Sequence, residues 1–442
     1  MDGAVRRGAP GDRYDPVVTE TPPPGRGAPP PLEDRYFRKG LGLRGEVKER
    51  IAGDYHSAIV RRFREEAFAL RVDDVTFRLA AQFGFCYGVD RAVDYAYQTI
   101  EKFPDRRVIL TGEIIHNPGV NARLRSKGIR FVGDPEVPTL SAVTAGDVVL
   151  LPAFGVPAGD FDRLARSGAV LVDTTCGSVL NVWKSVEKYA REGFTSLVHG
   201  KWAHEETRAT VSRVLLHPGG RYLVVLDLHE ADLVADYVRH GGDRDAFLAR
   251  FRTAASPGFD PDRDLARIGV ANQTTMLSSE SLEIARRVGR ALEDRYGEED
   301  GRARVRAFDT ICSATQDRQD ALEALLREPL DLLLVIGGFN SSNTTHLLEM
   351  AHGKVPAFHI EGPDGLVSAD VVRHRPIGGT AAVASRGWMP GRPATIGVTA
   401  GASTPDVTIG AVVTRVLTLF GLALPEVPPD DVRPGVAKAG PA

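Results

Sequence analysis

The three cysteines of this chain are the residues best suited to hold an inorganic cofactor. Cys86, Cys176 and Cys312 each follow a short apolar run and a polar or glycine turn, and each precedes a helix-like stretch. Such turns meet at the carboxyl edge of α/β sheets, where ligands bind. Any one cysteine could be a small buried apolar residue. Because all three stand at equivalent turns, the pattern favours shared chemistry.

The wide spacing of these cysteines favours an iron-sulfur cluster over structural zinc. Structural zinc usually takes four ligands and shows closely spaced Cys-x-x-Cys pairs, which this chain lacks. Three thiolates on a cubane leave one iron without a protein ligand. That iron could act as a Lewis acid on a substrate oxygen. A cysteine-nucleophile enzyme is the alternative, and it would need one essential thiol rather than three.

Polar stretches at further strand-to-helix turns could bind an oxyanion. The stretches are Glu113–Pro118, His199–Thr207, Asn272–Thr275, Asn340–Asn343 and Ala400–Asp406. Hydroxyl, amide and backbone N–H groups at helix starts can hold a diphosphate together with histidine. Taken singly, each stretch also fits ordinary helix capping. The pair His204 and Glu206 adds a candidate proton donor for cleavage of a C–O bond.

The elements that must position these residues follow an α/β pattern. Short Val, Ile and Leu runs alternate with amphipathic helical stretches, which predicts parallel sheets covered on both faces. We expect three small α/β domains. The predicted division is 1–35 as a disordered extension, 36–76 as a helical lead-in, 77–176, 177–311 and 312–424 as α/β domains, and 425–442 as a flexible tail. The expected strands are Phe77–Ala81, Arg107–Leu110, Val148–Leu151, Val170–Asp173, Ser196–His199, Tyr222–Leu226, Ile268–Ala271, Val305–Phe308, Leu332–Ile336, Ala357–Ile360 and Ile396–Val398.

Composition limits the class of protein and its partners. The 442 residues are 43% hydrophobic and 26% charged, with a formal net charge of -3. Lysine and arginine are spread along the chain and no apolar run is long enough to span a bilayer, so we expect neither a nucleic-acid nor a membrane partner. The low cysteine count and the absence of a secretory or transit-like leader predict a cytoplasmic location.

Several ordered motifs resemble those of the 4-hydroxy-3-methylbut-2-enyl diphosphate reductase family. They extend from about residue 77 to residue 422. They are Phe-Gly-Phe-Cys86-Tyr-Gly-Val-Asp, Glu-Ile-Ile-His116-Asn-Pro, Val-Asp-Thr-Thr-Cys176, His204-Glu-Glu-Thr, Asn-Gln-Thr274-Thr, Thr-Ile-Cys312-Ser-Ala-Thr-Gln-Asp-Arg-Gln, Asn340-Ser-Ser-Asn343 and Thr-Ala-Gly-Ala-Ser403-Thr-Pro-Asp.

The resemblance implies a fold, a cofactor and a reaction. It implies three α/β domains in a trefoil-like arrangement around one 4Fe-4S cluster. The reaction would be reductive dehydroxylation of an allylic diphosphate to isopentenyl and dimethylallyl diphosphates, the last step of the non-mevalonate isoprenoid pathway. An external electron donor such as ferredoxin or flavodoxin would supply the electrons.

The same resemblance assigns roles to particular residues. Cys86, Cys176 and Cys312 correspond to the cluster ligands, and Glu206 to the acid that delivers protons. His204 would support the proton path and hold a diphosphate oxygen, while Thr274 would position the hydroxyl end of the substrate. The other residues that match the family's diphosphate ligands are His116, Ser341, Ser342, Asn343 and Ser403.

One position departs from the pattern of many bacterial members. They have Ala-His-Gly where this chain has Ala153-Phe154-Gly155, so one diphosphate-binding histidine is absent. The Pro-Ala-Phe-Gly motif and the long N-terminal lead-in resemble the plant and cyanobacterial branch, and the composition favours a bacterial member. Two rival functions share the cysteine pattern: a non-redox iron-sulfur hydratase or dehydratase, and a cluster-bearing sensor or electron carrier.

Overall fold

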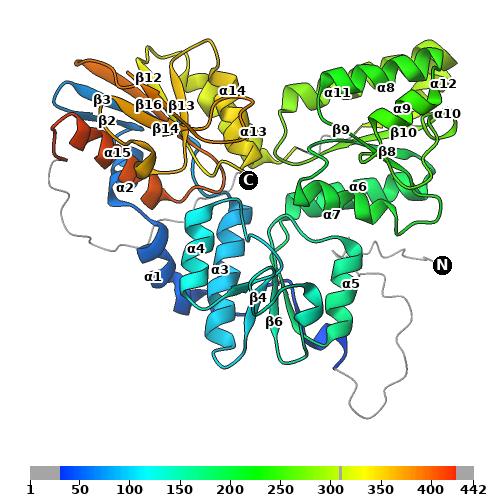
Figure 1. Ribbon diagram of the computed structural model, residues 1–442, viewed down its shortest axis with the longest axis horizontal. Helices are drawn as coiled ribbons and strands as arrows, with labels where there is room; N and C mark the ends of the chain where they lie inside the picture. The colour runs from blue at the N-terminus through cyan, green and yellow to red at the C-terminus, as the bar shows by residue number, and fades with distance from the viewer. Residues whose placement is uncertain (1–29, 308–310, 425–442) are drawn as a thin grey trace, which may run out of the picture.

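Three lobes, each built on one β-sheet, meet at the centre of the molecule (Figure 1). The structure, a computed structural model, describes residues 30–307 and 311–424. The predicted extension up to residue 29, the tail after residue 424, and Asp309 and Thr310 of the third cysteine motif lie outside the described residues. In each sheet the strand residues alternate between two helical layers, as expected for parallel sheets buried on both faces.

The first sheet has the strand order β1-β7-β6-β4-β5 and is parallel throughout. Val148 and Leu150 face the layer of α1, α3 and α4, whereas Val149 and Leu151 face α5. The bounds are β1 Tyr36–Phe37, β4 Val108–Leu110, β5 Arg130–Phe131, β6 Val148–Leu151, β7 Val170–Asp173, α1 Arg44–Tyr55, α3 Tyr87–Lys102, α4 Pro118–Ser126 and α5 Ala158–Ser167.

The second sheet has the order β11-β10-β8-β9 and is also parallel. Leu197 packs in the layer of α8 and α11, and Val198 packs in the layer of α6 and α7. The bounds are β8 Thr195–His199, β9 Tyr222–Val225, β10 Ile268–Asn272, β11 Val305–Ala307, α6 Gly177–Arg191, α7 Glu205–Val214, α8 Leu228–His240, α9 Arg244–Arg250, α10 Pro261–Asp264, α11 Ser278–Tyr296 and α12 Glu298–Ala303.

The third sheet combines strands from both ends of the described chain, in the order β13-β12-β16-β3-β2. Only the pair β2 and β3 is antiparallel in this sheet. Leu332 and Leu334 face α2 and α15, and Leu333 and Val335 face α13 and α14. The bounds are β2 Ala69–Val72, β3 Val75–Leu79, β12 Leu332–Ile336, β13 Ala357–Ile360, β16 Ala394–Ala400, α2 Ala58–Glu65, α13 Ser313–Leu325, α14 Ser342–Ala351 and α15 Asp406–Leu419. A separate hairpin pairs β14 (Val371–His374) with β15 (Val383–Arg386).

The α/β class with mostly parallel sheets is confirmed, but the N-terminal strands are distributed differently from the predicted division. Strand β3, assigned from sequence to the start of the first domain, pairs with β16 in the third sheet. The predicted helical lead-in contains α1 and α2 but also β1 and β2. Arg35, the last residue of the predicted extension, packs against the first domain: its buried guanidinium donates to the carbonyl oxygens of Ala165 and Ala169. The domain boundaries themselves stay a prediction.

None of the helices in the described ranges combines the length and the apolar character that crossing a bilayer requires.

Candidate active site

Each cysteine is the N-cap residue of a helix, and each helix follows a strand of a different sheet. Cys86 follows β3 of the third sheet, Cys176 follows β7 of the first, and Cys312 follows β11 of the second. The positive ends of three helix dipoles therefore lie beside the three sulfurs, and this stabilises thiolates.

The three sulfurs converge on one place. A Cβ atom at Gly88 would lie 2.6 Å from Cys176 Sγ and 3.9 Å from Cys86 Sγ, so both sulfurs flank this glycine. Burial raises the pKa of the Cys86 thiol, and the nearby Cys176 thiol adds to the rise. Burial raises the pKa of Cys312 to about 11, with Cys86 and Glu206 contributing. The structure thus brings together the cysteines that the sequence singled out.

A buried arginine accompanies the sulfurs. Arg318 is 4% exposed and donates to the Gly84 carbonyl at 2.5 Å and to the Ala314 carbonyl at 2.6 Å. Its charge opposes the rise in the pKa of Cys86. Three half-buried thiols, three helix N-termini and a guanidinium form a donor set that fits a metal-sulfur group, which requires deprotonated cysteines.

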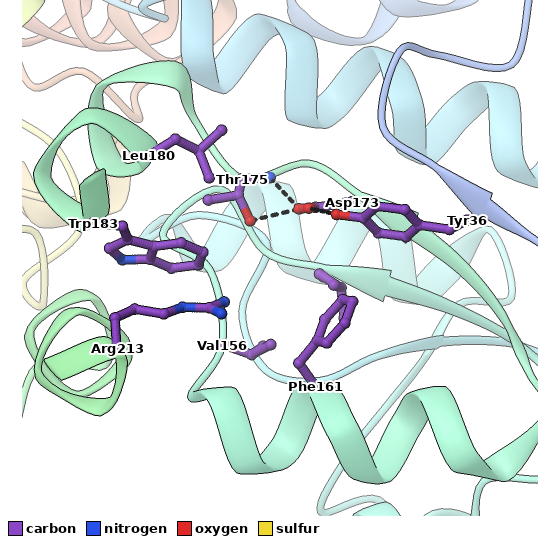
Figure 2. A pocket seen from close by; sticks show the side chains of 9 residues that line it. Tyr36, Val156, Phe161, Asp173, Thr175, Leu180, Trp183 and Arg213 are labelled. Carbon is purple, nitrogen blue, oxygen red and sulfur yellow. Dashed lines mark hydrogen bonds between the residues drawn. The ribbon is translucent and has the colours of Figure 1, made fainter. Parts of the chain in front are cut away.

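The loop that carries Cys176 is braced from the N-terminal strand β1. The Tyr36 hydroxyl donates to Asp173, and Asp173 Oδ1 accepts from the Thr175 backbone N–H at 2.9 Å and from the Thr175 hydroxyl at 2.5 Å. Figure 2 shows this chain of hydrogen bonds in a small pocket walled by Phe161 and Trp183. On the other side, Arg91 Nη1 donates to the Thr175 carbonyl at 2.8 Å. Sequence reasoning did not identify Tyr36 as a site residue, because Tyr36 lies in none of the motifs quoted above.

Glu206 lies in the first turn of α7, where it is 3% exposed. Its Oε1 accepts from the Thr274 backbone N–H at 2.6 Å, and its Oε2 accepts from the Thr274 hydroxyl at 3.0 Å. Burial raises the pKa of Glu206 to about 7, although the Thr274 hydrogen bonds act in the opposite direction. A carboxyl with this pKa can hold a proton near neutral pH and release it to a substrate.

His116 and His204 are in direct contact. Their Nε2 atoms are 3.1 Å apart, and the His116 ring stacks on Phe154 with centroids 4.7 Å apart. Glu113 Oε2 lies 2.9 Å from His116 Nδ1 and also accepts from Asn340 Nδ2 at 2.7 Å. Burial lowers the pKa of His204 to about 3, so this ring is neutral. Because the His116 ring stacks on it, the Phe154 ring fixes the plane of His116 from the position of the absent histidine.

The predicted serines and asparagine surround the same region. Ser341 caps α14, as the capping interpretation expected, and the Ser342 hydroxyl accepts from Gln273 Nε2 at 3.3 Å. Ser403 donates to the His116 carbonyl at 3.0 Å. Asn343 Oδ1 accepts from the Ala402 N–H, whereas its buried Nδ2 has no partner among the described residues. That free donor suits an anionic ligand.

Sequence reasoning missed the roles of Glu113, Asn340 and Arg318. All three lie inside the motifs quoted above, so a signal was present. Nothing in the local sequence distinguishes them from solvent-exposed or helix-capping residues. Their roles depend on contacts across sheets, which only the tertiary structure supplies.

Comparison with known proteins agrees with the motifs. Residues 77–417 match the family model described as LytB protein. A 4-hydroxy-3-methylbut-2-enyl diphosphate reductase from Gloeobacter violaceus is 50% identical over 88% of this chain and 93% of its own. One from Thermosynechococcus vestitus is 48% identical over 88% and 96%.

A solved structure agrees at the level of the fold. The E-1-hydroxy-2-methyl-but-2-enyl-4-diphosphate reductase from Plasmodium falciparum superposes with a TM-score of 0.56 at 20% identity, covering 82% of this chain and 94% of that one. The similarity to cyanobacterial proteins over most of the length confirms the predicted cyanobacterial-like branch. The chain therefore belongs to the LytB protein family, whose cyanobacterial members named above are its relatives.

Proposed function

We propose that this protein reduces (E)-4-hydroxy-3-methylbut-2-enyl diphosphate to isopentenyl and dimethylallyl diphosphates. The observation that supports this most is the convergence of three cysteines, one after each sheet, beside a buried carboxyl whose pKa is raised to about 7. The relatives named above carry the same activity in their names. The reaction breaks the C–O bond, consumes two electrons and two protons, and releases water.

Cys86, Cys176 and Cys312 would hold one 4Fe-4S cluster. When bound, such a cluster supplies electrons and one Lewis-acidic iron toward the substrate hydroxyl. An external carrier such as ferredoxin or flavodoxin delivers the electrons to the protein. Arg318 and the helix N-termini stabilise the negative charge of the thiolates.

Glu206 is the acid that protonates the departing hydroxyl. Thr274 donates two hydrogen bonds to this carboxyl and fixes its position. His204, whose Nδ1 accepts from the Glu206 N–H at 3.2 Å, lies between the acid and His116 and supports the proton path. The groups that bind the diphosphate are His116, His204, Ser341, Ser342, Asn343 and Ser403.

Anaerobic purification followed by iron and sulfide analysis tests the proposal. We expect about four irons and four sulfides per chain, as a single cubane requires. Turnover of the allylic diphosphate should need an added reductant. Turnover without a reductant would favour a hydratase or dehydratase, and a cluster without any turnover would favour a sensor or carrier. Either result would overturn the proposed reduction.

A further inference from the structure

Glu113 connects two lobes at the histidine pair. Its Oε2 accepts from Asn340 Nδ2 at 2.7 Å and lies 2.9 Å from His116 Nδ1. Glu113 follows β4 of the first sheet, and Asn340 follows β12 of the third. His204, which follows β8 of the second sheet, contacts His116 from the other side. One carboxylate therefore lies at the end of a hydrogen-bonded chain that joins all three sheets.

The hydrogen bonds of this chain fix the tautomers of both rings. The backbone N–H of Glu206 can only donate, so His204 Nδ1 must accept, and the neutral His204 ring carries its proton on Nε2. That proton is donated to His116 Nε2, which must then accept. His116 carries its own proton on Nδ1 and donates it to Glu113.

In this arrangement both histidine N–H groups already donate within the protein, so neither can donate to an anion. His204 donates to His116, and His116 donates to Glu113. The charged groups that face His116 are carboxylates, since Glu205 Oε2 also lies 3.7 Å from its Nε2. Glu206 faces the pair from α7, and Lys201 faces His204. A diphosphate would meet mostly negative charge here unless one ring became cationic.

We propose that Glu113 is a positioning residue that makes His116 take up one proton when a diphosphate binds, so that the imidazolium lies between Glu113 and a diphosphate oxygen. His116 Nδ1–H keeps its hydrogen bond to Glu113, and the new Nε2–H points to the ligand. The His204 Nε2–H, released from His116, becomes a second donor to the ligand. The proton comes from solvent, and no other covalent bond forms or breaks. The inference rests on the proposed function, because it takes the ligand to be a diphosphate.

The hydrogen-bond pattern selects His116 rather than His204 for this proton. A second proton on His204 would sit on Nδ1, directly opposite the Glu206 N–H. A second proton on His116 would sit on Nε2, facing the ligand, while the Glu113 carboxylate stabilises the positive ring. Together with Glu205, these rings also bring three possible metal-ligand atoms within 4.8 Å. The Nε2–H of His204 leaves no lone pair there for a metal, whereas the pair with one added proton would suit an anion.

Calorimetry measures the proposed proton directly. Inorganic diphosphate is titrated into the anaerobically reconstituted holoenzyme at pH 8, in two buffers that differ in ionisation enthalpy. At this pH an ordinary histidine is neutral, so the wild type should take up about one proton more per bound diphosphate than Glu113→Gln does. Loss of the charged hydrogen bond should also weaken diphosphate binding by about tenfold or more. The protonation of diphosphate itself is common to both proteins and cancels in the difference.

Two further variants separate a charge effect from a folding effect. In Glu113→Gln the amide oxygen can still accept from Asn340, and cluster absorbance and circular dichroism check that the fold is kept. Glu113→Asp, which restores the carboxylate, should recover part of the proton uptake. Glu205→Gln, which removes the more distant carboxylate, should change the uptake less than Glu113→Gln does.

The outcomes distinguish this inference from the proposed function. Equal proton uptake in the wild type and Glu113→Gln, with diphosphate bound by both, would overturn the role of Glu113 and leave the reductase proposal standing. Loss of uptake in Glu205→Gln but not in Glu113→Gln would overturn it as well. A wild-type holoenzyme that binds no diphosphate and shows no reductant-dependent turnover would overturn the proposed function and this inference with it.

Discussion

The cysteine region (Cys86, Cys176 and Cys312) and the histidine region (His116 and His204 with Glu113) are both assembled from all three sheets. They differ in what their polar groups must do before a ligand can bind. At the cysteines, burial raises the pKa of the Cys86 and Cys312 thiols, and these sulfurs must lose protons before they can bind a metal. At the histidines, the ring nitrogens of His116 and His204 are already hydrogen-bonded within the protein.

This difference indicates how each region responds to its ligand. The cysteine region is held in shape by its surroundings, namely Gly88, Arg318 and the braced Asp173 loop, and the proposed cluster would complete it. The histidine region must exchange internal hydrogen bonds for bonds to the ligand. Substitutions at the sulfurs should therefore act on cofactor content in an all-or-none way, and substitutions at the polar side should act on turnover and binding by degrees.

Removal of one thiolate should have the largest effect. Cys86→Ser, Cys176→Ser or Cys312→Ser should each strip or destabilise the cluster, because a neutral hydroxyl is a poor ligand for iron. Iron and sulfide content and cluster absorbance measure this. An intact cluster in all three variants would contradict the assignment of these cysteines.

Loss of the acid should come next and should leave the cluster in place. Glu206→Gln is nearly isosteric and should lower turnover by about 100- to 10,000-fold, the usual range for a general acid. In the wild type the acid is protonated below its pKa of about 7, so turnover should fall as pH rises through that value. In Glu206→Gln the residual activity should not show this fall in turnover with rising pH. If the fall remains, a group other than Glu206 causes it.

A methyl group between two sulfurs should give a smaller, partial loss. In Gly88→Ala the new Cβ would lie 2.6 Å from Cys176 Sγ, so that sulfur must shift. We expect reduced iron content and a cluster that decays faster in air. Gly177→Ala is the matched control, because a Cβ there meets nothing within 4 Å although it directly follows a cysteine. Equal cluster content in both variants would show that Gly88 does not set the sulfur positions.

Loosening the brace behind Cys176 should have the smallest effect. Tyr36→Phe removes the hydroxyl that donates to Asp173, which should cost about 1.5 to 3 kcal/mol of unfolding free energy, as for other hydrogen bonds to charged groups. Tyr237→Phe removes a similar bond to Asp262, far from the cysteines. Both variants should unfold at a lower temperature, but only Tyr36→Phe should shorten the lifetime of the cluster. The same cluster lifetime in both would exclude a brace at the Cys176 loop.

The strand positions and the cysteine turns could be predicted from the sequence, because the signals that specify them are local. Val148–Leu151 and Leu332–Ile336 form strands at the predicted positions, and Cys86, Cys176 and Cys312 stand at strand-to-helix turns as expected. Apolar periodicity and turn chemistry act over a few residues, so the chain carries these signals wherever the element ends up. The motifs also identified the family that the comparisons confirm.

Only the tertiary structure decided which strands pair and which side chains meet. Strand β3 pairs with β16, more than 300 residues away, so Cys86 comes from the third sheet although β4, β5, β6 and β7 of the first sheet follow it in the chain. The partnership of Glu113 with Asn340 and the support of Asp173 by Tyr36 also cross long stretches of sequence. The residues of a strand specify that the strand will be buried, but they do not specify which other strand it will pair with. That choice depends on how the apolar faces of the whole chain pack together.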